Sequence, residues 1–254
     1  MTIDKPSDRV MTPAVARAVA ILELLSAVRE PQRLSDIASE LELPLSSVSN
    51  LCTTLEAESL LVRNGLGFRL GPRIVELAHG YLDAMDPVAS FAEAVAETST
   101  LRHHTAQMGM LDGGEVLYVA RRDGDQPFRI SSAVGKRLPV SCTAIGKAAL
   151  SLVDNPLALL PPTLPSLTSR SLVDHAAFEL DLHAVADRGY AIDDQETSDG
   201  IMCFAIAVAP NEGPVMGMSA TILVASHTEA LEVELVGDLK SVMRKLWPAG
   251  SRSI

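Results

Sequence analysis

The stretch over residues 34–61 constrains the fold more than any other part of this 254-residue chain. Apolar residues recur at helical spacing on both sides of the dipeptide Leu43-Pro44. Because the residue before a proline is driven out of the α region, a first helix ends at this point and a second begins directly after it. Two short helices joined by a tight turn are typical of a helix–turn–helix, although a helical hairpin inside an ordinary bundle has the same pattern.

The second of these helices has two different faces. One face is apolar and is expected to be buried, with Val48, Leu51, Cys52 and Leu55. The other face carries small hydrogen-bonding side chains, namely Ser46, Ser47, Ser49, Asn50 and Thr53. Such side chains on an exposed helix after a tight turn can contact phosphates and base edges in the major groove of DNA. The sequence therefore predicts a DNA-binding helix.

The segments on either side complete a winged helix–turn–helix over residues 12–71. Thr12-Pro13 is a typical helix start, and this helix is expected to run to about Arg29 with an inward face of Val15, Val19, Leu22 and Leu25. Beyond the helix pair, short apolar runs flank Asn64-Gly65, which is a strong hairpin signal. The two strands of this wing carry Arg63 and Arg69, which could reach DNA phosphates. Residues 1–11 are expected to form a disordered lead.

The remainder of the chain reads as a linker helix over residues 72–85 and a second domain over residues 86–248. In that domain, runs typical of strands alternate with helical patterns, which predicts an α+β fold. Strands are expected over residues 104–111, 115–121, 127–133, 190–193, 201–209 and 215–224. Helices are expected from Asp86 to about Glu97 and over about 142–153, 174–188 and 228–246.

Charge and composition bear on the partners. The net charge of −11 argues at first against nucleic acid, but the charge is unevenly spread. Residues 1–75 hold eight basic and nine acidic residues, and the rest holds thirteen basic and twenty-three acidic residues. A near-neutral N-terminal part and an acidic C-terminal part are typical of a protein with two domains of different function. Three distant cysteines, no secretory signal and no apolar run of membrane-spanning length lead us to expect a cytoplasmic protein without membrane contact.

Enzymatic chemistry finds little support in the sequence. The segment from Gly217 to Thr221 departs from the nucleophile pattern of hydrolases, and no histidine or cysteine spacing suits a metal. Cys203 lies in an apolar strand, where burial makes a thiol inert. Cys142 lies at an expected helix start and is the better candidate for a reactive thiol. We therefore expect no catalytic residues, no metal and no cofactor.

Six motifs together resemble the IclR family of bacterial transcriptional regulators. In the front half they are V-A-R-A-V-A-I-L (15–22), L-S-D-I-A (34–38) and F-R-L-G (68–71). In the back half they are G-K-R-L-P-V-S-C-T-A-I-G-K-A (135–148), R-G-Y-A-I-D-D-Q-E (188–196) and G-I-M-C-F-A-I-A-V (200–208). Their order and spacing make the resemblance specific, and it covers about residues 12–247.

The resemblance implies a winged-helix DNA-binding domain, a linker helix and a GAF-like or profilin-like domain with an antiparallel sheet flanked by helices. Members form homodimers or tetramers on double-stranded promoter DNA. They bind a small-molecule effector, often an organic acid, and so control catabolic genes, with repression the expected direction here. The residues expected to contact DNA are Arg17, Arg33, Ser46, Ser47, Ser49, Asn50, Thr53, Arg63 and Arg69.

The resemblance also implies an effector pocket in the second domain. Its expected contacts are Ala144, Ile145, Asp193, Cys203, Ser219 and Thr221, with Ile130 and Ile201 as apolar walls. A helix start near Thr143 would offer free N–H groups to a carboxylate. The hydroxyls of Ser219 and Thr221 lie two residues apart on one strand, so both are expected to point into one cavity.

The chain departs from the family pattern at four positions. Leu45 and Asn50 stand where the recognition helix commonly carries basic residues, Ser59 stands where a glycine is usual, and Phe68 stands where tyrosine is common. Loss of two cations weakens attraction to phosphates, although the Asn50 amide could read adenine instead. Two alternatives therefore stay open: a small-molecule sensor with weak or lost DNA binding, and an enzyme with an accessory helical domain.

Overall fold

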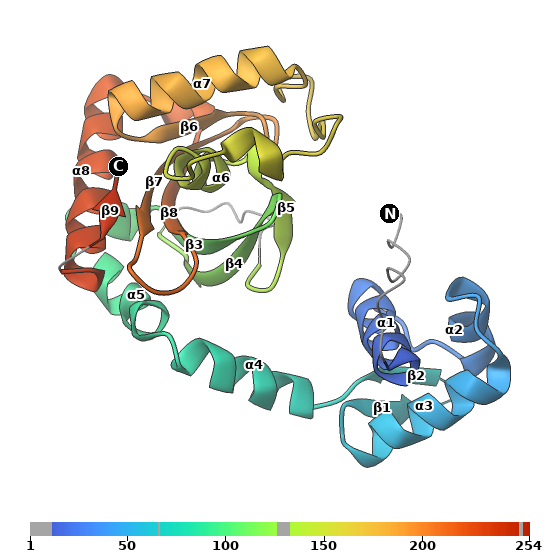
Figure 1. Cartoon of the computed structure of the whole chain (residues 1–254). Helices are drawn as coiled ribbons and strands as arrows, with labels where there is room; N and C mark the ends of the chain where they lie inside the picture. Colours follow the sequence, from blue (N-terminus) through green and yellow to red (C-terminus); the bar gives the residue numbers. More distant parts are fainter. Residues whose placement is uncertain (1–11, 66, 126–132, 249–250) are drawn as a thin grey trace. The chain divides into compact units, whose positions relative to one another are not determined.

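The computed structural model describes residues 12–65, 67–125, 133–248 and 251–254 (Figure 1). The chain divides into two compact units, Met1–Tyr81 and Leu82–Ile254. The division falls inside α4 (Arg73–Asp83), a helix without buried residues that occupies the segment expected as a linker. The expected lead over residues 1–11 lies outside the described residues. Among the described helices, none is long and apolar enough to cross a membrane.

The N-terminal unit is a winged helix–turn–helix. Its elements are α1 (Pro13–Ala27), α2 (Leu34–Glu40), α3 (Leu45–Ala57), β1 (Leu61–Asn64) and β2 (Gly67–Leu70). The two strands pair in antiparallel fashion. The apolar face predicted for the second helix of the pair is confirmed, because Val48, Cys52 and Leu55 are buried in the core of this unit.

α1 turns inward only part of the face that its sequence predicts: Leu25 is buried and Leu22 packs against the core, as expected. Ile21 and Leu25 are buried, whereas the side chains of Val15 and Val19 are 61% and 47% exposed. Apolar residues occur all round this helix, so helical periodicity fits more than one stripe. The prediction for Val15 and Val19 was therefore wrong, and both lie at the surface of the N-terminal unit.

The chain leaves α3 through a residue in the left-handed conformation. Ser59 has a φ of 59°. Gly71 lies so close that a Cβ on it would stand 2.1 Å from the carbonyl oxygen of Ser59. A residue with a side chain pays roughly 1–2 kcal/mol in this conformation, whereas glycine adopts it freely. This is the position at which the family pattern has glycine.

Replacing Ser59 with glycine is expected to stabilise the N-terminal unit by about 0.5–1 kcal/mol, because relief of the strained conformation exceeds the entropy gained by the unfolded chain. Calorimetric unfolding of the full chain measures the effect. Ser59→Ala is the control, since it removes the hydroxyl and keeps the Cβ. Equal stability of the glycine and alanine variants would contradict the prediction.

The C-terminal unit is built on an antiparallel sheet with the strand order β5-β4-β3-β8-β7-β6, and β9 pairs with β7. The strands are β3 (Thr105–Asp112), β4 (Glu115–Arg122), β5 (Arg137–Pro139), β6 (Ala191–Asp194), β7 (Ile201–Ala209), β8 (Met216–Leu223) and β9 (Arg252–Ser253). Five of the six predicted strands are present. The sixth, over residues 127–133, falls almost wholly outside the described residues, and the short strands β5 and β9 were not predicted.

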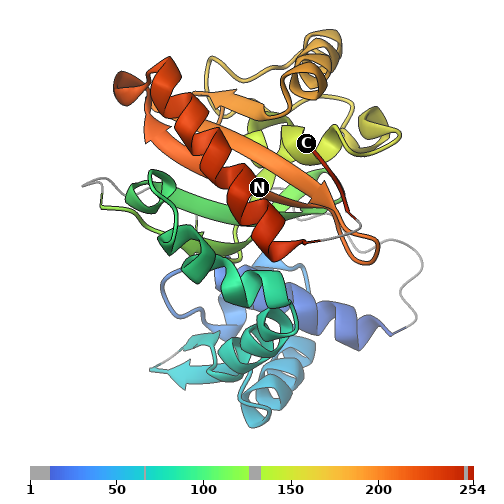
Figure 2. The same cartoon turned by 90° about the vertical axis from the view of Figure 1, so that its left-hand side faces the viewer.

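Helices cover both faces of this sheet, as Figures 1 and 2 show. α5 (Asp86–Ala96) and α8 (Glu229–Leu246) pack on one face, and α6 (Ala144–Leu150) and α7 (His175–Arg188) pack on the other. Side chains alternate along β8, so that Met218 and Ala220 join the core under α8 while Ser219 faces the other side. The predicted α+β architecture is confirmed.

α6 is shorter than the predicted helix over residues 142–153. Residues Val140–Cys142 form a 3-10 turn, and the Thr143 side chain then accepts a 3.0 Å hydrogen bond from Gly146 N, which caps the helix. α6 lies directly on the sheet, because a Cβ on Gly217 would stand only 2.7 Å from Ile145 Cγ2. Three further 3-10 turns span Leu101–His103, Pro156–Leu159 and Val224–Ser226.

Candidate functional site

The N-terminal unit has a hollow between α2, α3 and the wing, with a volume of about 550 Å³. Four of the expected DNA contacts line it, namely Arg33, Ser46, Ser49 and Arg63, together with Leu34, Ser35 and Leu45. Two guanidinium groups and hydroxyl donors on a helix N-terminal region suit phosphate oxygens. The leucine at position 45, where family members commonly have a cation, is 55% exposed in this hollow.

The other expected contacts lie outside the hollow. Ser47, Asn50 and Thr53 are on α3, Arg17 is on α1, and Arg69 is on β2. Asn50, Thr53, Arg17 and Arg69 are exposed, and Ser47 is half-buried. The Thr53 hydroxyl donates a 2.9 Å hydrogen bond to the carbonyl oxygen of Ser49, so its proton is engaged within the helix.

Arg63 on the wing is held by two neighbours. Its guanidinium lies 3.2 Å from Oε2 of Glu56 on α3, and its Cζ lies 4.4 Å from the centre of the Phe68 ring. The ring fixes the direction of the side chain, while the carboxylate neutralises part of its charge. An anion that binds Arg63 must therefore compete with Glu56.

Replacing Glu56 with glutamine is expected to raise DNA affinity by about threefold to tenfold and to steepen the salt dependence by up to about one unit, because Arg63 becomes available to one more phosphate. Fluorescence anisotropy with duplex DNA at several salt concentrations measures both quantities. Glu58→Gln is the matched control, because Glu58 pairs with Arg73, which lies outside the hollow, at 2.6 Å. The competition would be disproved by equal effects of the two substitutions.

The C-terminal unit contains a cavity of about 270 Å³ between α6 and the sheet. Six of the expected effector contacts line it: Ala144, Ile145, Asp193, Ile201, Cys203 and Ser219. They come from α6, β6, β7 and β8, so the topology brings together segments that are far apart in the sequence.

Two other expected contacts are not among these wall residues. Thr221 is fully buried, and its Oγ1 lies 3.5 Å from the Sγ atom of Cys203. These two residues are paired across β7 and β8, and of the pair Cys203 is the one among the cavity wall residues. The expectation that Thr221 lines the cavity was wrong. Ile130 lies outside the described residues.

Eight wall residues are not predicted from the sequence: Gln107, Tyr118, Lys136, Leu138, Thr143, Leu167, Thr197 and Ser198. Gln107 is a polar residue inside the apolar run of β3, and this pattern could have indicated a cavity residue. Its position beside Ser219 depends on the register of β3 and β8, which the sequence does not reveal. Among the described residues of the wall, Lys136 is the basic residue and Asp193 is the acidic residue.

Asp193 is the most deeply buried polar group of the wall, with an exposed fraction of 1%. Its Oδ1 accepts hydrogen bonds from the backbone N–H of Glu196 at 2.7 Å and of Thr197 at 3.2 Å. Its Oδ2 lies 2.6 Å from the hydroxyl oxygen of Thr197. Burial raises the pKa of Asp193 above its usual value, although these hydrogen bonds oppose the shift.

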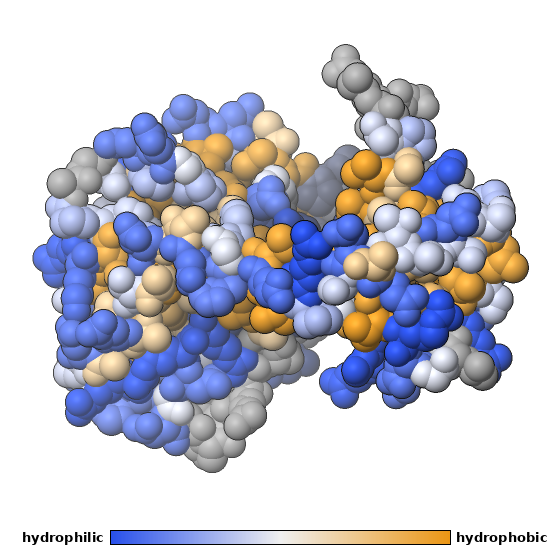
Figure 3. All heavy atoms as spheres, turned by 90° about the horizontal axis from the view of Figure 1, so that it is seen from below, coloured by the Kyte–Doolittle hydropathy of each residue, from blue (hydrophilic) through white to orange (hydrophobic). Residues whose placement is uncertain are grey.

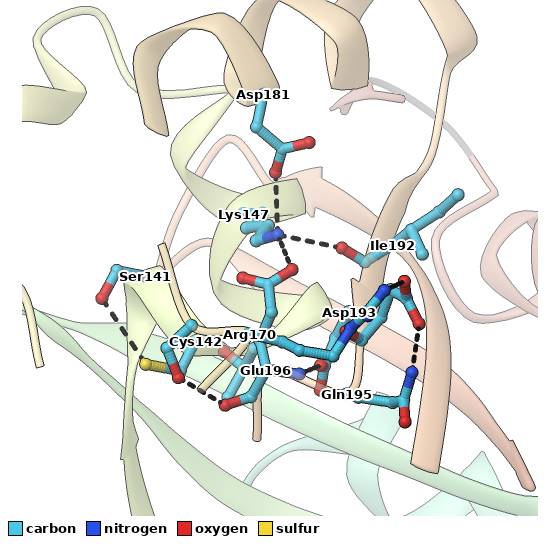
Figure 4. Close-up of polar contacts among 12 residues, drawn as sticks. Ser141, Cys142, Lys147, Arg170, Asp181, Ile192, Asp193, Gln195 and Glu196 are labelled. Carbon is cyan, nitrogen blue, oxygen red and sulfur yellow. Dashed lines mark hydrogen bonds and ion pairs between the residues drawn. The ribbon is translucent and has the colours of Figure 1, made fainter. Parts of the chain in front are cut away.

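A buried ion cluster lies behind the cavity wall (Figure 4). Lys147 on α6 is 1% exposed, and its ammonium lies 2.8 Å from Asp181 Oδ2, 3.0 Å from the carbonyl oxygen of Ile192, and against Glu196. Burial raises the pKa of Glu196 to about 7, although Lys147 opposes the shift. The cluster ties α6 to α7, β6 and the loop after β6, and three of these four segments carry cavity residues.

The cysteines are poor nucleophiles. Burial raises the pKa of Cys142, and it raises the pKa of Cys203 well above its usual value. The interpretation of Cys142 as a reactive thiol was therefore wrong, because the cost of burying a thiolate outweighs the adjoining helix start. Within the described ranges, no group of three or more His, Cys, Asp or Glu residues could hold a metal ion.

Comparisons with known proteins agree with this geometry. The model of the IclR helix-turn-helix domain matches residues 14–65, and the model of the bacterial transcriptional regulator IclR C-terminal region matches residues 79–246. The HTH-type transcriptional regulator XynR of Escherichia coli is 28% identical to the chain over 225 residues, which cover 87% of this chain and 89% of that protein.

Solved structures share the fold. An IclR transcriptional regulator from Alicyclobacillus acidocaldarius has a TM-score of 0.81 at 24% identity, covering 93% of this chain and 98% of that one. An IclR homolog from Microbacterium hydrocarbonoxydans, complexed with 4-hydroxybenzoate, has a TM-score of 0.78 at 22% identity and covers 93% of this chain and all of that one. The curated relatives are transcriptional regulators rather than enzymes. The chain therefore belongs to the IclR family of bacterial transcriptional regulators, with a helix–turn–helix domain followed by an effector-binding domain.

Proposed function

We propose that this protein is a cytoplasmic repressor that binds promoter DNA through α3 and the wing and releases it when a small organic acid occupies the cavity. The single observation that carries the proposal is the presence, in one chain, of an arginine-lined hollow beside α3 and a cavity with polar walls in the second unit. A protein that acts on bacterial promoters works in the compartment that holds the DNA.

The chemistry of the cavity supports a small, oxygen-rich ligand. The hydroxyls of Thr143 and Thr197 donate to backbone carbonyl oxygens, which leaves the hydroxyls of Tyr118 and Ser219 and the ammonium of Lys136 as donors around a volume of about 270 Å³. These donors suit a carboxylate that carries a short apolar or aromatic body against Ile145 and Ile201. The 4-hydroxybenzoate bound by a structural relative is a molecule of this kind.

The N-terminal unit also carries apolar surface that fits a second copy of the chain. Val15 and Val19 on α1 and Val75, Leu77 and Tyr81 on α4 are exposed, with fractions from 47% to 70%. Figure 3 shows apolar residues, coloured orange, at the surface near the middle of the view. Exposed apolar stripes of this kind mark protein interfaces, and a dimer would present two α3 helices to paired DNA half-sites. Light scattering is expected to give at least twice the chain mass of 27.0 kDa.

Binding of the organic acid would act through coupling between the two states of the protein. A ligand that binds one arrangement of the dimer better shifts the population toward it. Coupling of about 1–3 kcal/mol changes DNA affinity by several-fold to about a hundredfold. Reciprocity requires that DNA weaken ligand binding by the same factor.

A specific observation favours a second candidate function, a sensor with weak DNA binding. Leu45 and Asn50 replace cations on the exposed face of α3, and Glu56 neutralises part of Arg63. A transcript measurement separates the two functions. Deletion of the gene is expected to raise transcription from the promoter that the protein binds. Lower transcription would show an activator, and unchanged transcription at every bound promoter would favour the sensor.

A further inference from the structure

The carboxyl group of Asp193 takes part in a short chain of hydrogen bonds that has too few protons if the acid is ionised. Thr197 Oγ1 lies 2.7 Å from the carbonyl oxygen of Cys142 and 2.6 Å from Asp193 Oδ2. A hydroxyl has one proton, and a carbonyl oxygen can only accept. When Thr197 donates to Cys142, the proton between Thr197 and Asp193 must come from Asp193.

The charges around Asp193 lead to the same result. Lys147 lies near Asp193, but this ammonium already pairs with Asp181 and Glu196, and Lys136 on the same cavity wall is exposed to solvent. The other titratable groups that face Asp193 are Tyr118 on β4, Cys142 before α6, Cys203 on β7 and Glu196 on the following loop. Within the described part of the chain, no cation lies at ion-pair distance from Asp193. An ionised carboxyl that is 1% exposed would carry an uncompensated buried charge.

We propose that Asp193 is a neutral carboxylic acid at pH 7, that its proton completes the chain from Asp193 through Thr197 to Cys142, and that the cavity consequently selects an anionic group. This rests on the proposed function, in which the cavity is the ligand site. With Asp193 neutral, Lys136 is the only formal charge among the described wall residues. A carboxylate ligand then meets a positive site, whereas an ionised Asp193 would repel it.

The direction of the pKa shift agrees with this geometry, since burial raises the pKa of Asp193. Asp194, the next residue, provides the contrast within the same strand. Hydrogen bonds from Gln195 and Arg170 lower its pKa even though partial burial opposes them, and Arg170 also forms an ion pair with it. Two adjacent aspartates are thus held in opposite protonation states by different neighbours.

Carbon-13 NMR of the full chain, labelled at the aspartate carboxyl carbons, tests the ionisation directly. The Asp193 signal is identified by its loss in Asp193→Asn, and the Asp194 signal by its loss in Asp194→Asn. At pH 7 we expect the Asp193 signal at the position of a protonated acid and the Asp194 signal at that of a carboxylate. A carboxylate position for Asp193 at pH 7 would overturn the proposal. This measurement involves neither DNA nor ligand, so its failure leaves the proposed function standing.

The pH dependence of stability provides a second readout. A folded-state pKa above the unfolded value means that the stability contributed by Asp193 is fully present at low pH and is lost as pH rises through the folded pKa. Asparagine can donate to Thr197 and accept from both backbone amides as the neutral acid does. We therefore expect the melting temperature of Asp193→Asn, relative to the unmodified protein, to rise between pH 5 and pH 8. Asp194→Asn should show no such rise over this range, because the pKa of Asp194 lies below it in both the folded and the unfolded chain, and a parallel rise of both variants would overturn the proposal.

A thermal-shift panel of monocarboxylates, their amides and the corresponding amines tests the selectivity. Carboxylates are expected to raise the melting temperature more at pH 6 than at pH 8, and in Asp193→Asn the shift should no longer depend on pH. A larger shift with amides or amines would overturn the selectivity for an anion. If no carboxylate shifts the transition while NMR shows a neutral Asp193, the selectivity fails and the ionisation stands.

Discussion

Lys147→Met is expected to lower the stability of the C-terminal unit by about 3–5 kcal/mol at pH 8, because it leaves the buried Glu196 and the partly exposed Asp181 without their cation. Lys147 is 1% exposed and contacts both carboxylates and the carbonyl oxygen of Ile192. Methionine fills a similar volume, so the loss reports on charge rather than on packing. Calorimetric unfolding of the full chain measures it.

The loss should be smaller at pH 6 than at pH 8. Burial raises the pKa of Glu196 to about 7. The stability linked to its protonated form is therefore fully present at pH values below the usual pKa of a glutamate, and it is lost as the pH rises through about 7. At pH 6 Glu196 takes up a proton, and one of the two uncompensated charges disappears. Adding Glu196→Gln to Lys147→Met should therefore recover part of the stability at pH 8.

Lys136→Met is the matched control for this variant. Lys136 is an exposed lysine that also lines the cavity, and its replacement is expected to change stability by less than about 0.5 kcal/mol. If Lys147→Met and Lys136→Met had equal effects, or if the loss from Lys147→Met were the same at both pH values, the buried cluster would not hold the cavity walls as described.

Arg33→Ala is expected to weaken DNA binding by about tenfold at low salt and to reduce the salt dependence by about 0.9 units, the contribution of one phosphate. Arg33 directly precedes α2 and lines the hollow with Arg63, Ser46 and Ser49. Loss of a phosphate contact weakens binding to all sequences alike, so the preference for the promoter should stay unchanged.

Anisotropy titrations with the promoter duplex and a scrambled duplex measure both effects. Arg244→Ala on α8 of the C-terminal unit is the control, since it removes an equal charge far along the chain from the hollow. An equal loss of affinity in Arg244→Ala would show that overall charge, and not the hollow, attracts the DNA.

Periodic patterns predicted the elements of this fold well. The face of α3 with Val48, Cys52 and Leu55 follows from helical spacing, and β7 follows from its continuous apolar run, which is typical of a strand buried on both faces. α1 shows the limit of such patterns. Its apolar residues surround the helix, so only the packing of α2, α3 and the wing decides that Ile21 is buried and that Val15 is exposed.

The cavity was only partly predictable, because its walls depend on pairings between distant segments. The family resemblance located Asp193, Cys203 and Ser219, all of which line it. Gln107 was missed because the register of β3 against β8 places it beside Ser219. Lys147 was visible in the sequence as part of a G-K-A motif, but its buried partners come from α7 and from the loop after β6.

Fluorescence anisotropy of the full chain on duplex DNA from upstream of its own gene tests the central claim most directly. A scrambled duplex is the comparison, and salt is set at about 50 and about 200 mM. The account predicts tight binding that weakens steeply at the higher salt and prefers the upstream duplex by at least about a thousandfold. Binding that is absent at low salt, or equal for both duplexes, would contradict the claim that this chain is a sequence-specific regulator that binds promoter DNA.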